Sequence, residues 1–336
     1  MQALIGSDNK TFAGVIADGN NGVLATNNNF NGGPGYQIGI LQLNSGLGGS
    51  GGTWILSGSN TYSGSTRIDA GTGGIRLEGN GTIGFPTPNG LTGPMRIYGG
   101  FLDLNGHNQT ISLLQDGNSS ARIFNSAVGT VSTLTIGYGN EQANRSCSYQ
   151  LMDNPGTGGI LALRKIITAP YQIPNSSLMA TNCYQKLTAT CVATYSGDTT
   201  VDGGTLWIQG PSAISPNSAY RLSTANYATL RLEYVGTANC RQLWIDGVQQ
   251  PNGVYGAGTS GIDPLSTGTV TVTGADPTLT FSRSGNTLTL SWVGSGYKLQ
   301  YKTGSLAAPW CDYTGGTSSP VVTTIGSGAK FFRLSK

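Results

Sequence analysis

The sequence predicts an all-β protein: a right-handed parallel β-helix, or solenoid, followed by a small antiparallel β-sandwich module. Three observations support this fold class. No long stretch has helical periodicity free of glycine and turn residues. Short segments that alternate apolar and polar residues recur along the chain, each closed by Gly, Asn or Asp. One motif occurs twice, which favours a stack of similar coils over a single closed domain.

The composition predicts a folded chain with a polar but weakly charged surface. Only 10% of the 336 residues are charged, and 53 are Gly. An average soluble domain has roughly 25% charged residues, so Ser, Thr and Asn must solvate most of this surface. Hydrophobic residues make up 37% of the chain, which is enough for a packed core and argues against disorder.

The charge and hydropathy patterns exclude several partners. The net charge is +3, and the 18 Lys and Arg residues form no basic cluster, so we expect neither nucleic acid nor an anionic membrane as a partner. The longest apolar runs, such as residues 159–163, are far shorter than the roughly 20 residues of a membrane-spanning helix. Residues 1–6 do not resemble a signal peptide. We therefore expect a chain from which the signal has been removed, or a fragment.

The expected strands are three to six residues long, and two of them follow copies of the repeated motif. Residues 61–69, TYSGSTRID, recur as residues 194–202, TYSGDTTVD. A glycine-rich turn and an apolar strand follow each copy. Such units stack as coils whose inward side chains form one continuous core. The clearest expected strands are 53–56, 66–68, 74–77, 102–104, 133–136, 205–208, 230–232 and 269–272.

The sequence LSGSNTYSG at residues 56–64 resembles the autotransporter-associated β-strand repeat of bacterial passenger regions. Residues 11–16 and 102–111 match flanking parts of that family, and residues 247–256 resemble the segment that closes such arrays. The resemblance implies a solenoid over residues 1–275, built from two degenerate cycles, and an extracellular or cell-surface location.

Two regions depart from the family pattern. Residues 141–193 contain three of the five Cys residues and a stretch with two prolines, which we interpret as an irregular insertion leaving the solenoid. Residues 277–336 contain cleanly alternating segments at 287–292, 297–302 and 330–334. They predict a small antiparallel sandwich, similar to the fibronectin-like terminal modules of secreted bacterial proteins. No strands of an outer-membrane barrel are recognisable.

The cysteines are consistent with a local disulfide, leave at least one of the five free or paired between chains, and predict no metal site. There is no C-x-x-C pair, and His107 has no Cys neighbour. Cys183 and Cys191 are close in sequence and are candidates for a disulfide. Pairing of Cys147 with another cysteine is the alternative.

The sequence contains no recognisable catalytic constellation, so we predict no enzyme activity and no cofactor. Asp198 and Asp202 are the nearest approach to a carboxylate pair, but their place in the repeat favours turn capping. His107 lies in a turn, and no nucleophile motif accompanies it. Trp54 and Trp207 follow strand periodicity, which favours stacking in the core or between coils. Trp310 is a weak candidate for a glycan contact, with packing of the module as the alternative.

These observations favour an extracellular structural or adhesive protein that assembles end to end into a surface fibre. The ends of a solenoid present unpaired backbone groups, so Leu4 and Ile5 are candidates for a contact with another copy, in a head-to-tail arrangement. A carbohydrate-binding protein that recognises cell-surface glycans is the first alternative. A β-helix polysaccharide lyase or hydrolase is a weaker one.

Overall fold

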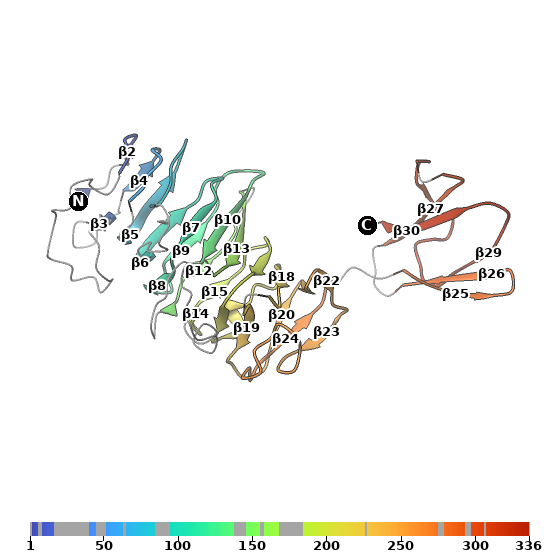
Figure 1. The fold of residues 1–336 in the computed structure, drawn as a ribbon. Coiled ribbons are helices and arrows are strands. Elements are labelled where there is room, and N and C mark those ends of the chain that lie inside the picture. The colour runs from blue at the N-terminus through green and yellow to red at the C-terminus, as the bar shows by residue number, and fades with distance from the viewer. Residues whose placement is uncertain are drawn as a thin grey trace. The chain divides into compact units, whose positions relative to one another are not determined.

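Figure 1 shows the computed structural model of the chain, which divides into two compact units, residues 1–274 and 275–336. The structure describes residues 2–5, 9–16, 40–44, 52–62, 65–84, 95–137, 146–154, 158–167, 184–225, 227–274, 279–292, 297–305 and 307–335. Within these residues, the only helix is a single 3₁₀ turn, η1 (Pro211–Ala213). No helix in the described part of the chain is long and apolar enough to cross a membrane.

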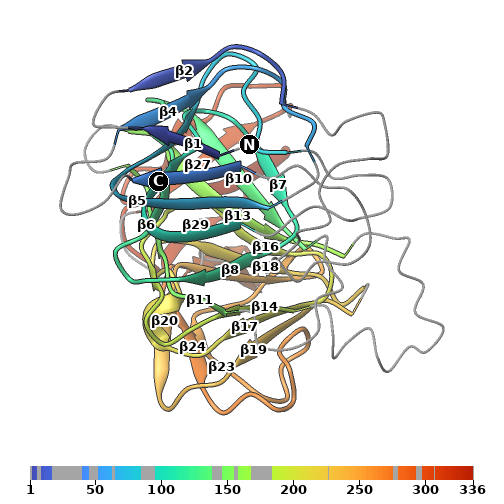
Figure 2. The ribbon, with the colours of Figure 1, turned by 90° about the vertical axis from the view of Figure 1, so that its left-hand side faces the viewer.

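The first unit is a β-solenoid, as the sequence predicts, and it has about six turns. Its strands lie across the stack, one above the next (Figure 2), and almost all pair in parallel with strands of neighbouring coils. Four sheets contain the strands. The largest sheet has β1 (Gln2–Ile5), β2 (Lys10–Phe12), β3 (Ile40–Asn44), β4 (Thr53–Leu56), β5 (Thr66–Leu77), β6 (Met95–Asp103), β8 (Leu114–Gly117), β9 (Arg122–Phe124), β12 (Gln150–Leu151) and β15 (Val192–Ala193).

The other three sheets of this unit complete the coils. The seven-stranded sheet has β7 (Gln109–Ile111), β10 (Val131–Ile136), β13 (Ile160–Lys165), β16 (Thr199–Val201), β18 (Ala219–Leu222), β21 (Gln242–Ile245) and β22 (Val248–Gln249). The four-stranded sheet has β11 (Ser146–Cys147), β14 (Tyr184–Leu187), β17 (Thr205–Ile208) and β19 (Thr229–Leu232). The three-stranded sheet has β20 (Thr237–Cys240), β23 (Gly253–Tyr255) and β24 (Thr269–Val272).

The alternation in the sequence produces a continuous inner column of apolar side chains. Leu206 pairs with Leu230, and Ile208 with Leu232, on adjacent parallel strands. All four side chains are buried. Successive residues of a strand point to opposite faces, so the polar residues between them face outward.

The repeated TYSG motif builds a buried hydrogen bond in both copies. Tyr62 Oη lies 2.7 Å from Thr66 Oγ1, and Tyr195 Oη lies 2.6 Å from Thr199 Oγ1. The two copies lie in different sheets, since Thr66 begins β5 and Thr199 begins β16. The motif therefore marks a local hydrogen bond within a coil and not a particular face of the solenoid.

Carboxylates tie the turns of neighbouring coils together. Asp153 Oδ2 accepts hydrogen bonds from the Ser196 backbone N–H and hydroxyl, at 3.0 and 2.6 Å. Asp103 binds Ser126 in the same way, and Asp246 binds Thr224. Several of the chain's few acidic residues are thus used as connectors between coils.

The interpretation of residues 141–193 as an insertion leaving the solenoid is wrong for the part that the structure describes. β11 to β15 all lie in this range, and all pair in parallel with solenoid strands. A coil can lengthen in its connecting segments while its strands still stack. Residues 138–145, 155–157 and 168–183 are not among the residues that the structure describes.

Antiparallel strands occupy the C-terminal end of the solenoid. β22 folds back on β21 through a tight turn in which Asp246 and Gly247 both have positive φ, the conformation of a type I′ hairpin. β23 pairs antiparallel with β24. These short strands lie in the segment whose sequence resembles the closing part of passenger arrays.

The second unit is a small β module. One sheet contains β25 (Thr280–Ser284), β26 (Thr287–Ser291) and β29 (Val321–Thr324), and the other contains β27 (Lys298–Thr303), β28 (Cys311–Asp312) and β30 (Lys330–Ser335). All pairings are antiparallel. Leu290, Trp292, Leu299 and Val321 form its core. The likeness to fibronectin-like modules stays a prediction.

Candidate functional site

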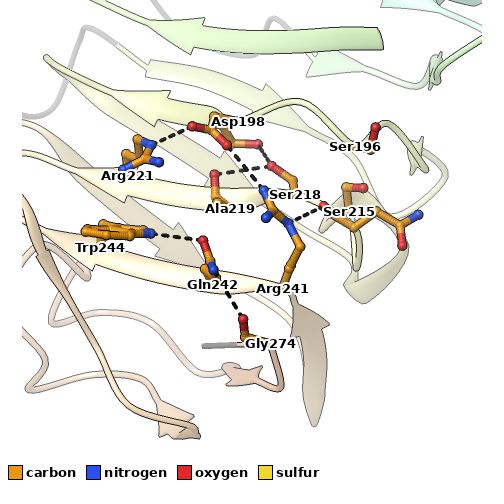
Figure 3. A network of polar contacts seen from close by, with 12 residues as sticks. Ser196, Asp198, Ser215, Ser218, Ala219, Arg221, Arg241, Gln242, Trp244 and Gly274 are labelled. Atoms are coloured by element: carbon orange, nitrogen blue, oxygen red, sulfur yellow. Dashed lines mark hydrogen bonds and ion pairs between the residues drawn. The ribbon is translucent and has the colours of Figure 1, made fainter. Parts of the chain in front are cut away.

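Asp198 is the centre of a polar network on the outer face of the seven-stranded sheet (Figure 3). Its carboxylate pairs with Arg221 Nε at 2.5 Å and with Arg241 Nη2 at 3.5 Å. The two arginines come from the next two coils. Thr200 pairs with Arg221 in the parallel register, and Asp198, two residues before Thr200, shares its side of the strand.

The network continues across the next strand to an aromatic ring. Arg221 Cζ lies 4.7 Å from the centroid of Trp244, its partner in the β18–β21 register. Trp244 Nε1 donates to Gln242 Oε1 at 3.3 Å, and Gln242 Nε2 donates to the Gly274 carbonyl at 3.2 Å. We call Asp198, Arg221, Arg241, Gln242 and Trp244 the Asp198 network.

An open depression of about 460 Å³ adjoins the network over β10, β13 and β16. Val131, Ile160 and Ala162 supply apolar lining, while Arg164, Ser196 and Asp198 supply polar groups. Gly197 lies in the wall of the depression, where no larger residue fits. A Cβ at this position would lie 2.3 Å from the Leu161 carbonyl oxygen. Its backbone N–H donates to that same oxygen at 3.1 Å.

The carboxylates of this face are held by arginines. Asp202 pairs with Arg164 at 2.6 Å, and Asp198 pairs with Arg221 and Arg241. A glycoside hydrolase needs two carboxylic groups that face each other across the scissile bond, and here each carboxylate is directed to a different cation. The mixture of apolar floor, guanidinium, carboxylate and hydroxyl groups is suited to reversible binding of a polar ligand.

A second cationic and aromatic ladder lies on the four-stranded sheet. Lys186, Trp207 and Arg231 are consecutive in the register of β14, β17 and β19. Both cations lie 4.2 Å from the Trp207 ring, a distance at which cation–π attraction operates. Trp207 Nε1 donates to Glu233 at 2.8 Å. Partial burial acts to raise the pKa of Glu233, but hydrogen bonds from Gln209 and Trp207 and the charge of Arg231 lower it overall.

The tryptophans that the sequence singles out have three different environments. Trp54 is buried and packs against Phe12, with ring centroids 5.2 Å apart. Trp207 faces outward and stacks between coils, as described above. Trp310 lies in the second unit, half-buried, with Lys302 Nζ and Arg333 Cζ over its ring at 4.5 and 4.4 Å. Its role as a glycan contact stays a prediction.

The remaining residues predicted from the sequence are scattered. Leu4 and Ile5 belong to β1. Among the described strands, β1 lies at one end of the largest sheet, next to β3. Cys191 is buried, and Cys183 lies outside the described residues, so their disulfide stays a prediction. His107 makes only turn contacts in the described part of the chain: Nδ1 lies 3.0 Å from the Leu104 carbonyl and Nε2 lies 2.9 Å from the Gly79 carbonyl.

Sequence reasoning missed Arg221, Arg241 and Trp244. Residues that are neighbours on consecutive coils are 21 residues apart for Thr200 and Arg221 but 23 residues apart for Arg221 and Trp244, so no single repeat interval brings these residues together in the sequence.

The comparisons with known proteins agree with this architecture. The family described as Passenger-associated-transport-repeat matches residues 50–72 and 187–208, which include β4 with part of β5 and β15 to β17. No solved structure matches the chain. The solenoid defines the class of protein, a β-solenoid repeat protein, and two of its segments are similar to the passenger-associated repeat.

Among curated proteins, the chain is similar to the Adhesin BmaC autotransporter of Brucella suis biovar 1 (strain 1330). The two are 29% identical over 241 residues, which cover 70% of this chain. The matched region is 6% of the length of that adhesin, so this chain corresponds to a small part of it.

Proposed function

We propose that this chain is an adhesive, non-enzymatic part of a passenger protein displayed outside the bacterial cell. The similarity to an autotransporter adhesin over 70% of the chain carries the proposal. The passenger-associated repeats support the same location.

The chemistry of the outer faces supports binding over catalysis. The depression beside the Asp198 network combines an apolar floor with arginine, aspartate and serine side chains, and sugars are bound by just such mixtures of apolar contact and directed hydrogen bonds. A glycan of a cell surface is therefore the ligand class that we propose.

The test uses fluorescently labelled chain and a panel of cultured epithelial cells, before and after enzymatic removal of surface glycans. We expect saturable binding that falls after glycan removal. Absence of saturable binding to every cell type would contradict the adhesive role. Binding that survives glycan removal would contradict the glycan as ligand. Release of sugar products from polysaccharides would contradict the non-enzymatic role.

A second candidate function is end-to-end assembly. In the described part of the chain, β1 has a strand partner, β3, on one side only, and a parallel ladder ending in this way can be extended by a further coil or by a second copy. Leu4 and Ile5 would then lie at the junction. Light scattering and negative-stain electron microscopy at rising concentration test this: we expect rods that lengthen, and a monodisperse monomer at the highest concentration would contradict assembly.

A further inference from the structure

Two cysteines from consecutive coils meet inside the solenoid. Cys147 ends β11, and Cys191 immediately precedes β15. Both side chains are fully buried. The Cys147 thiol is close enough to the Cys191 thiol to raise its pKa.

The backbone around the pair fixes this meeting. The Cys147 carbonyl accepts hydrogen bonds from the Thr188 N–H at 2.9 Å and from its hydroxyl at 3.1 Å. The Thr188 carbonyl in turn accepts the N–H of Cys191 at 3.0 Å. On the other side of the corner, Val192 N donates to the Tyr149 carbonyl at 3.1 Å. The two cysteines therefore belong to one corner that is hydrogen-bonded on both sides.

The other described cysteines are placed elsewhere. Cys240 is buried in β20, and η1 contacts both β15 and β20, so another turn of chain lies between Cys191 and Cys240. Cys311 is exposed and belongs to the second unit. Cys147 and Cys191 are the pair of described cysteines that the fold brings together.

We propose that Cys147 and Cys191 form a disulfide between consecutive coils when the chain folds under oxidising conditions. Both buried thiols belong to one corner that is hydrogen-bonded through Thr188, so forming the bond of about 2.05 Å requires side-chain rotation and no new strand pairing. The bond would close the segment of residues 148–190 into a loop, which contains β12, β13 and β14.

The reaction is a thiol–disulfide exchange with a low-molecular-weight disulfide such as oxidised glutathione. One cysteine thiolate attacks a sulfur of the oxidant and releases one reduced thiol. The second thiolate attacks the mixed disulfide and releases the other. Two cysteine thiols are oxidised, one disulfide of the oxidant is reduced, and the two cysteine protons are carried by the two released thiols.

We expect the disulfide to form while the chain folds and not after folding is complete. The hydrogen bond with Cys147 and burial both raise the pKa of the Cys191 thiol, and only the thiolate attacks a disulfide. We therefore expect rapid oxidation during refolding and slow oxidation of the native, reduced chain.

The test is refolding of the full chain with a glutathione redox couple, followed by alkylation of free thiols and tryptic mass spectrometry without reduction. Trypsin cuts after Arg145, Arg164 and Lys186, so Cys147, Cys183 and Cys191 fall on three different peptides. We expect a cross-linked species that joins residues 146–164 to residues 187–221. Alkylated, free Cys147 after oxidative refolding would overturn the proposal, and so would a Cys183–Cys191 cross-link.

Thermal unfolding gives a second readout. We expect the oxidised chain to unfold roughly 5 °C above the reduced chain, and the difference to vanish in Cys147→Ser. The matched control Cys240→Ser, at another buried thiol, should retain it. Where Cys147→Ser fails to fold, the peptide cross-link in the unmodified chain decides.

Discussion

The phenol oxygen of Tyr195 lies 2.6 Å from the hydroxyl oxygen of Thr199, and both side chains are buried. Thr199 Oγ1 also lies 2.8 Å from Ser218 Oγ, which belongs to the next coil. The same Tyr–Thr bond recurs between Tyr62 and Thr66. The motif that marks the repeat in the sequence is therefore a buried polar link in the two coils that contain it.

Replacing Tyr195 with Phe removes one member of this link and leaves its buried partners with fewer hydrogen bonds. We expect a loss of about 1–2 kcal/mol in the free energy of unfolding, and a similar loss for Tyr62→Phe. Urea denaturation measures both. Tyr227→Phe is the control, because Tyr227 is 46% exposed. Equal denaturation midpoints for Tyr195→Phe and the control would contradict the role of the motif.

Gly197→Ala should destabilise the solenoid, because it introduces a clash between two adjacent coils at the wall of the depression. The new Cβ would lie 2.3 Å from the Leu161 carbonyl oxygen, a backbone atom of the preceding coil. We expect a loss of roughly 2–3 kcal/mol, measured by denaturation. Gly253→Ala is the matched control, since its nearest neighbour would lie at 3.6 Å. A neutral Gly197→Ala would show that the coils do not approach this closely.

The solenoid should lose stability in alkaline solution. Burial raises the pKa values of Tyr62, Tyr195 and Tyr220 well above the ordinary value. The unfolded chain releases these protons from about pH 10 upward while the folded chain retains them, so stability is complete below pH 10 and falls above it. Each such tyrosine contributes about 1.4 kcal/mol per pH unit. Thermal unfolding between pH 8 and 11 measures the slope.

Tyr195→Phe provides the control for the alkaline effect. Its stability above pH 10 should fall less steeply than that of the unmodified chain, by the contribution of one group. Parallel slopes for the two proteins would contradict the buried, protonated state of Tyr195.

Asp198→Asn should change stability little. Its ion pairs are at the surface: the exposed fraction of the side chain is 36% for Asp198, 42% for Arg221 and 44% for Arg241. Exposed ion pairs contribute at most about 1 kcal/mol to stability. We expect a denaturation midpoint close to that of the unmodified chain, with or without 0.5 M salt. A large loss of stability would make Asp198 a structural residue and remove it from the candidate binding surface.

The sequence predicts the solenoid because its period-two alternation, its glycine turns and the TYSG motif are local signals. The pairs that form the outer surface are not local. Leu163 pairs with Thr199, while Ala219 pairs with Gln242, so the length of a coil varies, and neighbours cannot be found from one fixed spacing. The cysteines and prolines of residues 141–193 suggest an insertion, yet β11 to β15 stack as ordinary coils. Cys147 ends β11 and Cys191 immediately precedes β15, so these cysteines are part of the stacked coils, because strand pairing is set by the backbone and the inward residues.

We propose that this solenoid binds a surface glycan through the outer face at the Asp198 network. The most direct measurement is the equilibrium binding of labelled chain to epithelial cells. It compares the unmodified protein with Arg221→Ala/Trp244→Ala and with a control, Lys330→Ala, at an exposed position of the second unit. We predict at least a tenfold weaker binding for the double variant, about 1.4 kcal/mol or more, at a similar denaturation midpoint, and unchanged binding for the control. Equal binding by all three proteins would contradict the claim.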